Sequence, residues 1–86
     1  MENKIEILKF SATWCGPCKV LANTLKDVEG ITNIDIDKDR ETPVKYGIRS
    51  VPTLVFLKDG KEVHRQSGNM PLDMYNQILD EINLNK

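Results

Sequence analysis

At 86 residues, 40% of them hydrophobic, the chain can bury one modest core and is too apolar for a disordered protein. We therefore predict a single domain over residues 1–86. A net charge of -1, without a basic stripe, argues against nucleic acid or an anionic membrane as the main partner. The N-terminal residues carry no apolar secretion signal, and no segment approaches a membrane span, so we expect a cytoplasmic protein.

The first half of the chain predicts a strand, a helix and a second strand. Residues 4–10 form a near-continuous apolar run, typical of a buried parallel strand, which Lys9 interrupts. From residue 15 to about residue 29, apolar side chains recur at helical spacing, and Gly30 supplies a stop. Residues 31–37 alternate between apolar and polar side chains, as in a half-exposed strand. The two strands of such a unit should be parallel.

The second half predicts a short helix, a hairpin and a longer helix. Residues 39–46 favour a brief helix. Residues 53–58 form a second apolar strand, and an Asp-Gly dipeptide joins it to residues 61–66, a strong signal for an antiparallel hairpin with a type I′ turn. His64 would lie on this last strand, at the surface. The apolar residues of 71–82 then share one face of a helix.

The element order β-α-β-α-β-β-α predicts an α/β protein with a four-stranded mixed sheet and helices on both faces. Both cysteines of the chain, Cys15 and Cys18, would lie at the carboxyl end of the first strand, where open α/β sheets usually place functional sites. A disulfide that closes so short a loop contributes only about 2 kcal/mol to stability, so a purely structural bridge is a poor explanation.

Metal binding is also a poor explanation for the cysteine pair. A structural zinc site needs four ligands, and His64 is the one further soft candidate. The acidic run Asp35, Asp37 and Asp39 lacks the glycine and the glutamate that an EF-hand loop requires. We therefore predict no metal site and interpret the acidic run as a solvated strand end.

Reactivity explains the position of the cysteines better. A helix N-terminus stabilises a thiolate, and Cys15 would occupy that position, which makes it the expected nucleophile. Cys18 lies one turn further on and is the natural resolving thiol. Pro17 suits a first helical turn, and Gly16 leaves the approach to Cys15 open. The neighbouring Trp14 is either a substrate-facing surface or a cap on the core.

Two separated stretches resemble the hallmarks of the thioredoxin family. Residues 12–19 (Ala-Thr-Trp-Cys-Gly-Pro-Cys-Lys) match its active-site signature. Residues 46–53 (Tyr-Gly-Ile-Arg-Ser-Val-Pro-Thr) look like the segment that leads into its cis proline. Gly68 and Asn69 fall where the family has a glycine before its last helix. The resemblance covers residues 4–82.

The resemblance implies a substrate groove beside the cysteine pair. Pro52 would be cis, and the Val51 backbone would pair with an extended substrate. The rim of the groove would consist of Trp14, Gly16, Pro17, Gly68 and Asn69. The implied activity is reduction of protein disulfides through a reversible Cys15–Cys18 disulfide. No cofactor is expected, and a flavin- or ferredoxin-linked thioredoxin reductase would recycle the oxidised form.

The chain also departs from the family. The usual extra strand and helix before the active-site strand are missing, so the chain resembles the compact, glutaredoxin-sized thioredoxins and residues 31–37 would form an exposed edge. Lys9 stands where thioredoxins usually carry a buried Asp, and Asn33 lies near the position of the lysine that accompanies that Asp. Lys9 would either reach solvent or stay near the site, where it would favour thiolates as a modulator of their pKa.

Two alternatives to a thioredoxin-type reductase stay open at this point. A glutaredoxin-like enzyme recycled by glutathione suits the small size, but glutaredoxins usually carry Pro-Tyr between the cysteines. A non-catalytic thioredoxin-fold subunit would lend its groove to a partner protein, although the presence of both cysteines argues against it. A reductase that serves many partners is most simply a monomer.

Overall fold

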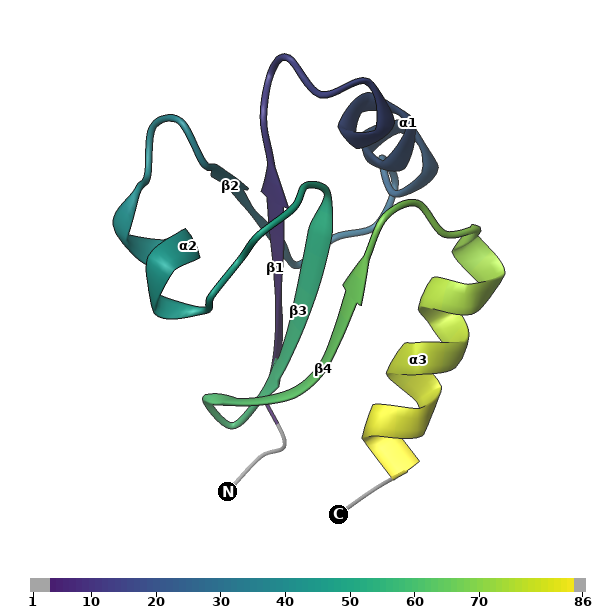
Figure 1. Cartoon of the computed structure of the whole chain (residues 1–86). Coiled ribbons are helices and arrows are strands. Elements are labelled where there is room, and N and C mark those ends of the chain that lie inside the picture. Colours follow the sequence, from purple (N-terminus) through teal and green to yellow (C-terminus); the bar gives the residue numbers. More distant parts are fainter. Residues whose placement is uncertain (1–3, 85–86) are drawn as a thin grey trace.

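The computed structural model describes residues 4–84, which form a four-stranded sheet with helices on both faces (Figure 1). The strands are β1 (Ile5–Ser11), β2 (Ile31–Asp35), β3 (Thr53–Lys58) and β4 (Lys61–Ser67). The helices are α1 (Gly16–Thr24), α2 (Glu41–Lys45) and α3 (Leu72–Leu84). The strand order is β2-β1-β3-β4, with β1 parallel to β2 and antiparallel to β3. The predicted fold class and element order are confirmed.

Side chains of β1 alternate between the two faces of the sheet. Ile7 packs into the larger core cluster with residues of α1 and α3, among them Leu21 and Tyr75. Phe10 packs on the opposite face with Val55 of β3. Because side chains alternate along a strand, Lys9 shares the face of Ile7 and lies under α1.

Helix α1 is shorter than predicted, since it ends at Thr24 rather than near residue 29. The Leu25 N–H closes the last helical turn on the Leu21 carbonyl, and the Val28 N–H then bonds to the Leu25 carbonyl in a tight turn. This turn carries Val28 back against the core. Asn23, Thr24 and Asp27 are weak helix formers, so local propensity does little to extend the helix beyond this point. The packing of Val28 then decides where the helix stops.

Each carboxylate of the acidic run has a separate structural role. The Asp35 carboxylate accepts the Asp37 N–H at 2.9 Å and ends β2 two residues earlier than predicted. Asp39 accepts the Glu41 and Thr42 N–H groups and the Thr42 hydroxyl, so it caps α2, and these bonds lower its pKa. Within residues 4–84, no three His, Cys, Asp or Glu side chains are grouped so as to hold a metal ion.

The hairpin has the predicted turn, with left-handed backbone at Asp59 (φ 53°) and Gly60 (φ 86°). The prediction that His64 is a surface residue is wrong. Its side chain is half-buried, because the register of β4 places it opposite Phe56 on the α3 face. The two rings meet edge to face, with centroids 5.5 Å apart.

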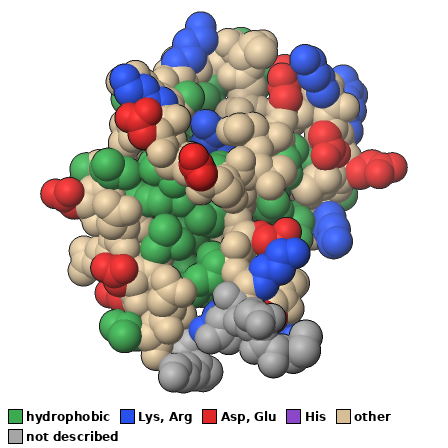
Figure 2. Space-filling model, turned by 180° about the vertical axis from the view of Figure 1, so that it is seen from behind, with side chains coloured by type: hydrophobic (Ala, Val, Ile, Leu, Met, Phe, Trp, Pro, Cys, Tyr) green, Lys and Arg blue, Asp and Glu red, His purple; other side chains and the backbone are tan. Residues whose placement is uncertain are grey.

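Strand β2 forms an edge of the sheet, as predicted. Figure 2 views the molecule from behind, the side on which β2 lies, and shows hydrophobic side chains gathered at the surface. Several side chains at the margin of the larger core cluster are only partly buried, namely Ile5, Val28, Ile31 and Leu79. Within residues 4–84, no helix is long and apolar enough to cross a lipid bilayer.

The position of α1 on the sheet depends on Leu21, which is completely buried, whereas its neighbour Val20 is exposed. Leu21→Ala should lower the free energy of unfolding by about 3 kcal/mol through lost apolar burial and the cavity left behind. Val20→Ala, in the same helix, should change it by less than about 0.5 kcal/mol. Urea denaturation of both variants measures the difference, and equal effects would contradict this account of α1.

Candidate active site

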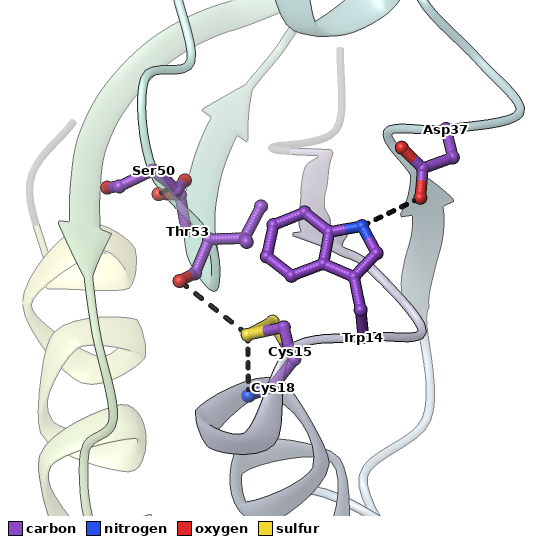
Figure 3. The surroundings of a disulfide bond; sticks show 7 residues. Trp14, Cys15, Cys18, Asp37, Ser50 and Thr53 are labelled. Carbon is purple, nitrogen blue, oxygen red and sulfur yellow. Dashed lines mark hydrogen bonds between the residues drawn. A yellow bond between two sulfur atoms is a disulfide. The ribbon is translucent and has the colours of Figure 1, made fainter.

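The cysteine pair lies where β1 gives way to α1. Cys15 is the N-cap of α1, and its sulfur accepts the Cys18 backbone N–H at 3.1 Å. The two sulfurs form a disulfide, with Cα atoms 5.2 Å apart (Figure 3). Pro17 lies in the first turn, where its missing N–H costs no hydrogen bond, and Gly16 faces open space.

This geometry supports a thiolate on Cys15. Unpaired N–H groups and the positive end of the helix dipole meet at a helix N-terminus, and one of these N–H groups already points at the Cys15 sulfur. Both residues are almost completely buried, with 5% of Cys15 and 3% of Cys18 exposed, so exposure does not distinguish them. Their hydrogen bonding does, because the Cys18 N–H is directed at Cys15.

The segment before β3 faces the disulfide. The Val51–Pro52 peptide bond is cis, as the resemblance implied. The Val51 carbonyl oxygen lies 3.8 Å from the Cys15 sulfur, and the Pro52 side chain is fully buried behind it. The Gly68 N–H donates to the Pro52 carbonyl at 2.8 Å, and the Thr53 hydroxyl donates to the Ser50 carbonyl. These bonds fix the segment beside the cysteines.

Trp14 is not a cap on the core, because 66% of its surface is exposed. Its indole N–H donates to the Asp37 carboxylate at 2.9 Å, and Figure 3 shows the ring directed toward this residue. The bond joins the active-site loop to the segment after β2. Sequence reasoning missed this role of Asp37, because nothing in the local pattern indicates which side chain a carboxylate 23 residues away will meet.

A cavity of about 280 Å³ opens beside Trp14. Of the predicted groove residues, Trp14 and Val51 line it, while Gly16, Pro17, Gly68 and Asn69 do not. Its other walls are Ile36, Pro43, Ile48, Arg49 and Ser50, residues that the sequence analysis did not select. Three of these, Ile48, Arg49 and Ser50, belong to the hallmark segment 46–53, so that segment could have predicted them as cavity residues.

A second cavity, of about 180 Å³, lies on the α1 side of the pair and includes Cys18 and Lys9 in its lining. Only 9% of the Lys9 residue is exposed, so most of its side chain is buried in the lining of this cavity. Burial lowers its pKa from the ordinary value of 10.5. Among residues 4–84, its amino group has no hydrogen-bond or ion-pair partner.

The chain is similar to known proteins over most of its length. The profile of the family described as Thioredoxin matches residues 1–81. Thioredoxins of Staphylococcus aureus and Staphylococcus epidermidis are 38% and 35% identical to this chain, and each match covers 94% of this chain and 85% of the relative. The chain belongs to the thioredoxin family.

Solved thioredoxin structures share the fold. A point mutant of the thioredoxin from Halobacterium salinarum matches with a TM-score of 0.86 at 29% identity, over 93% of this chain and 75% of that one. The reduced Schistosoma mansoni thioredoxin pre-protein matches with a TM-score of 0.81 at 34% identity, over 91% and 79%. With its cysteine pair at the helix terminus, this thioredoxin-family protein is a thiol–disulfide oxidoreductase.

The lowered pKa of Lys9 predicts how the stability of the oxidised protein depends on pH. Between this lowered value and 10.5, the unfolded chain binds a proton on Lys9 that the folded chain has lost, so the free energy of unfolding should rise with pH. Lys9→Met should remove this contribution, whereas the exposed substitution Lys26→Met should leave it unchanged.

Urea denaturation between about pH 8 and about pH 10 tests this dependence. The range ends at about pH 10 because burial raises the pKa of Tyr75. That shift lowers the free energy of unfolding as the pH rises further, and so opposes the effect of Lys9. The same slope in wild type and Lys9→Met would contradict the assignment.

Proposed function

We propose that this protein reduces disulfide bonds in other proteins, with Cys15 as the attacking thiol and Cys18 as the resolving thiol. The observation that carries the proposal is the hydrogen bond from the Cys18 N–H to the Cys15 sulfur at the N-terminus of α1. A thiolate, rather than a thiol, attacks a disulfide, and this position stabilises the anion.

The reaction then proceeds in two exchanges. The Cys15 thiolate attacks one sulfur of the substrate disulfide, a mixed disulfide forms, and the other substrate sulfur leaves as a thiolate that takes a proton from solvent. The Cys18 thiolate next attacks the Cys15 sulfur, which breaks the bond to the substrate. Two electrons have passed to the substrate, and the Cys15–Cys18 disulfide remains.

The substrate would lie along the segment that contains Val51. The Val51 carbonyl faces the Cys15 sulfur, so a chain that hydrogen-bonds to the Val51 backbone would bring its own sulfur within reach. Trp14 supplies an exposed aromatic surface on one side, and we assign the rest of the rim to Gly16, Pro17, Gly68 and Asn69. The buried Pro52 ring would act by holding Val51 in place.

A complete cycle needs a partner that reduces the Cys15–Cys18 disulfide, and we propose a thioredoxin reductase, flavin- or ferredoxin-linked, for this role. Gly-Pro between the cysteines supports this choice, because it is the thioredoxin form of the pair, and thioredoxin lies at the reducing end of dithiol potentials. We also propose that the protein acts as a monomer in the cytoplasm, where partner proteins keep such pairs reduced.

Removal of the resolving thiol tests these roles. Cys18→Ser should accumulate mixed disulfides between Cys15 and protein substrates in a cell extract, because nothing attacks the Cys15 sulfur. Cys15→Ser, which keeps one thiol in the same turn, should trap at least about tenfold less protein, since only Cys15 is activated. Non-reducing electrophoresis and mass spectrometry identify the adducts. Equal trapping by both variants, or adducts of glutathione alone, would contradict the proposal.

A further inference from the structure

Lys9 is an unusual residue for the centre of this sheet. It lies on β1 between its register partners Asn33 of β2 and Leu54 of β3, with its side chain on the face that α1 covers. It is more than nine-tenths buried, and within residues 4–84 its amino group has no polar partner. The side chain is mostly buried and its ammonium is unpaired within these residues, so an anion in the same cavity would stabilise the charged form.

The cavity beside Lys9 shows which group can do so. Three other titratable side chains line it, namely Cys18, Lys19 and Asp35. Lys19 has the same charge and is exposed. Asp35 forms no ion pair with Lys9, and its carboxylate accepts the Asp37 N–H instead. Cys18 is the remaining candidate, and it has no charge while it is bonded to Cys15.

We propose that the Lys9 ammonium is the counter-ion of the Cys18 thiolate in the reduced protein. Lys9 is then a positioning residue for the resolving step, and this part of the inference rests on the proposed function. Lys9 stays protonated beside the thiolate, and the proton of the Cys18 thiol passes to solvent. The Cys18 thiolate then attacks the Cys15 sulfur, two electrons pass to the substrate sulfur, and the substrate thiolate leaves.

The charge acts on the redox equilibrium as well as on the resolving step. In the disulfide form Cys18 is uncharged, Lys9 forms no ion pair within residues 4–84, and burial lowers the pKa of its amino group. In the dithiol form a thiolate on Cys18 would compensate the charge, so Lys9 favours the reduced protein over the oxidised one. An uncharged residue at this position should shift the equilibrium toward the disulfide.

The pKa of Cys18 is the direct test, measured in a Cys15→Ser background where Cys18 is the sole thiol. Lys9→Gln in this background should lower the acid dissociation constant of Cys18 by about tenfold, because unit charges within several ångströms interact strongly at protein-like dielectric constants. Lys9→Arg keeps the charge and should retain most of the effect. Lys26→Gln removes an exposed charge and should change nothing. The pH dependence of thiolate absorbance gives each value.

Redox titration of the two-cysteine protein gives a second readout. As the pH rises to and past the wild-type Cys18 pKa, Lys9→Gln should shift the equilibrium with glutathione increasingly toward the disulfide, by up to about tenfold, or about 30 mV. Near-ultraviolet circular dichroism shows which variants keep the fold. If Lys9→Gln does not fold, Lys9→Met replaces it in both measurements. An unchanged Cys18 pKa in folded Lys9→Gln and Lys9→Met would overturn the inference.

This outcome is independent of the proposed function. If Cys18→Ser traps protein substrates while the Cys18 pKa does not respond to Lys9, the reductase stands and the counter-ion is wrong. If the Cys18 pKa responds but no protein is trapped, the counter-ion stands and the proposed substrate class is wrong.

Discussion

The hydrogen bond from the Cys18 N–H to the Cys15 sulfur is the interaction on which the site depends. It requires α1 to begin at Gly16, so that Cys15 caps the helix and receives an N–H of the first turn. The helix stays in this position because Leu21 and Leu25 are buried in the core cluster that also contains residues of β1, β3 and α3. The fold therefore places the Cys15 sulfur at the N-terminus of α1, the positive end of the helix dipole.

The second wall of the site is held by a separate set of bonds. Thr53 and Gly68 bond to the carbonyls of Ser50 and Pro52, so the ends of β3 and β4 brace the cis peptide segment. The Val51 carbonyl is thereby placed against the cysteine pair. Trp14 is held from a third direction by Asp37. A substrate would thus meet a surface built from segments distant in sequence and already fixed before binding.

Local patterns predicted most of the fold, because strand alternation, the Asp-Gly turn and the helical stripe of α3 are short-range signals. The two motifs likewise located Cys15, Cys18 and Pro52. The failures have tertiary causes. The end of α1 depends on how Val28 packs, and the burial of His64 depends on the register of β4. The contact between Trp14 and Asp37 and the isolation of Lys9 also require the assembled sheet.

The activation of Cys15 is best tested by the pH dependence of its alkylation in the reduced Cys18→Ser variant, where it is the sole thiol and the backbone N–H at position 18 is retained. The account predicts a pKa at least about one unit below the ordinary value of about 8.5, because the helix terminus and this N–H stabilise the thiolate. Iodoacetamide reaction rates across pH give the value directly. A pKa at or above about 8.5 would show that the helix terminus does not activate Cys15 and would contradict the account.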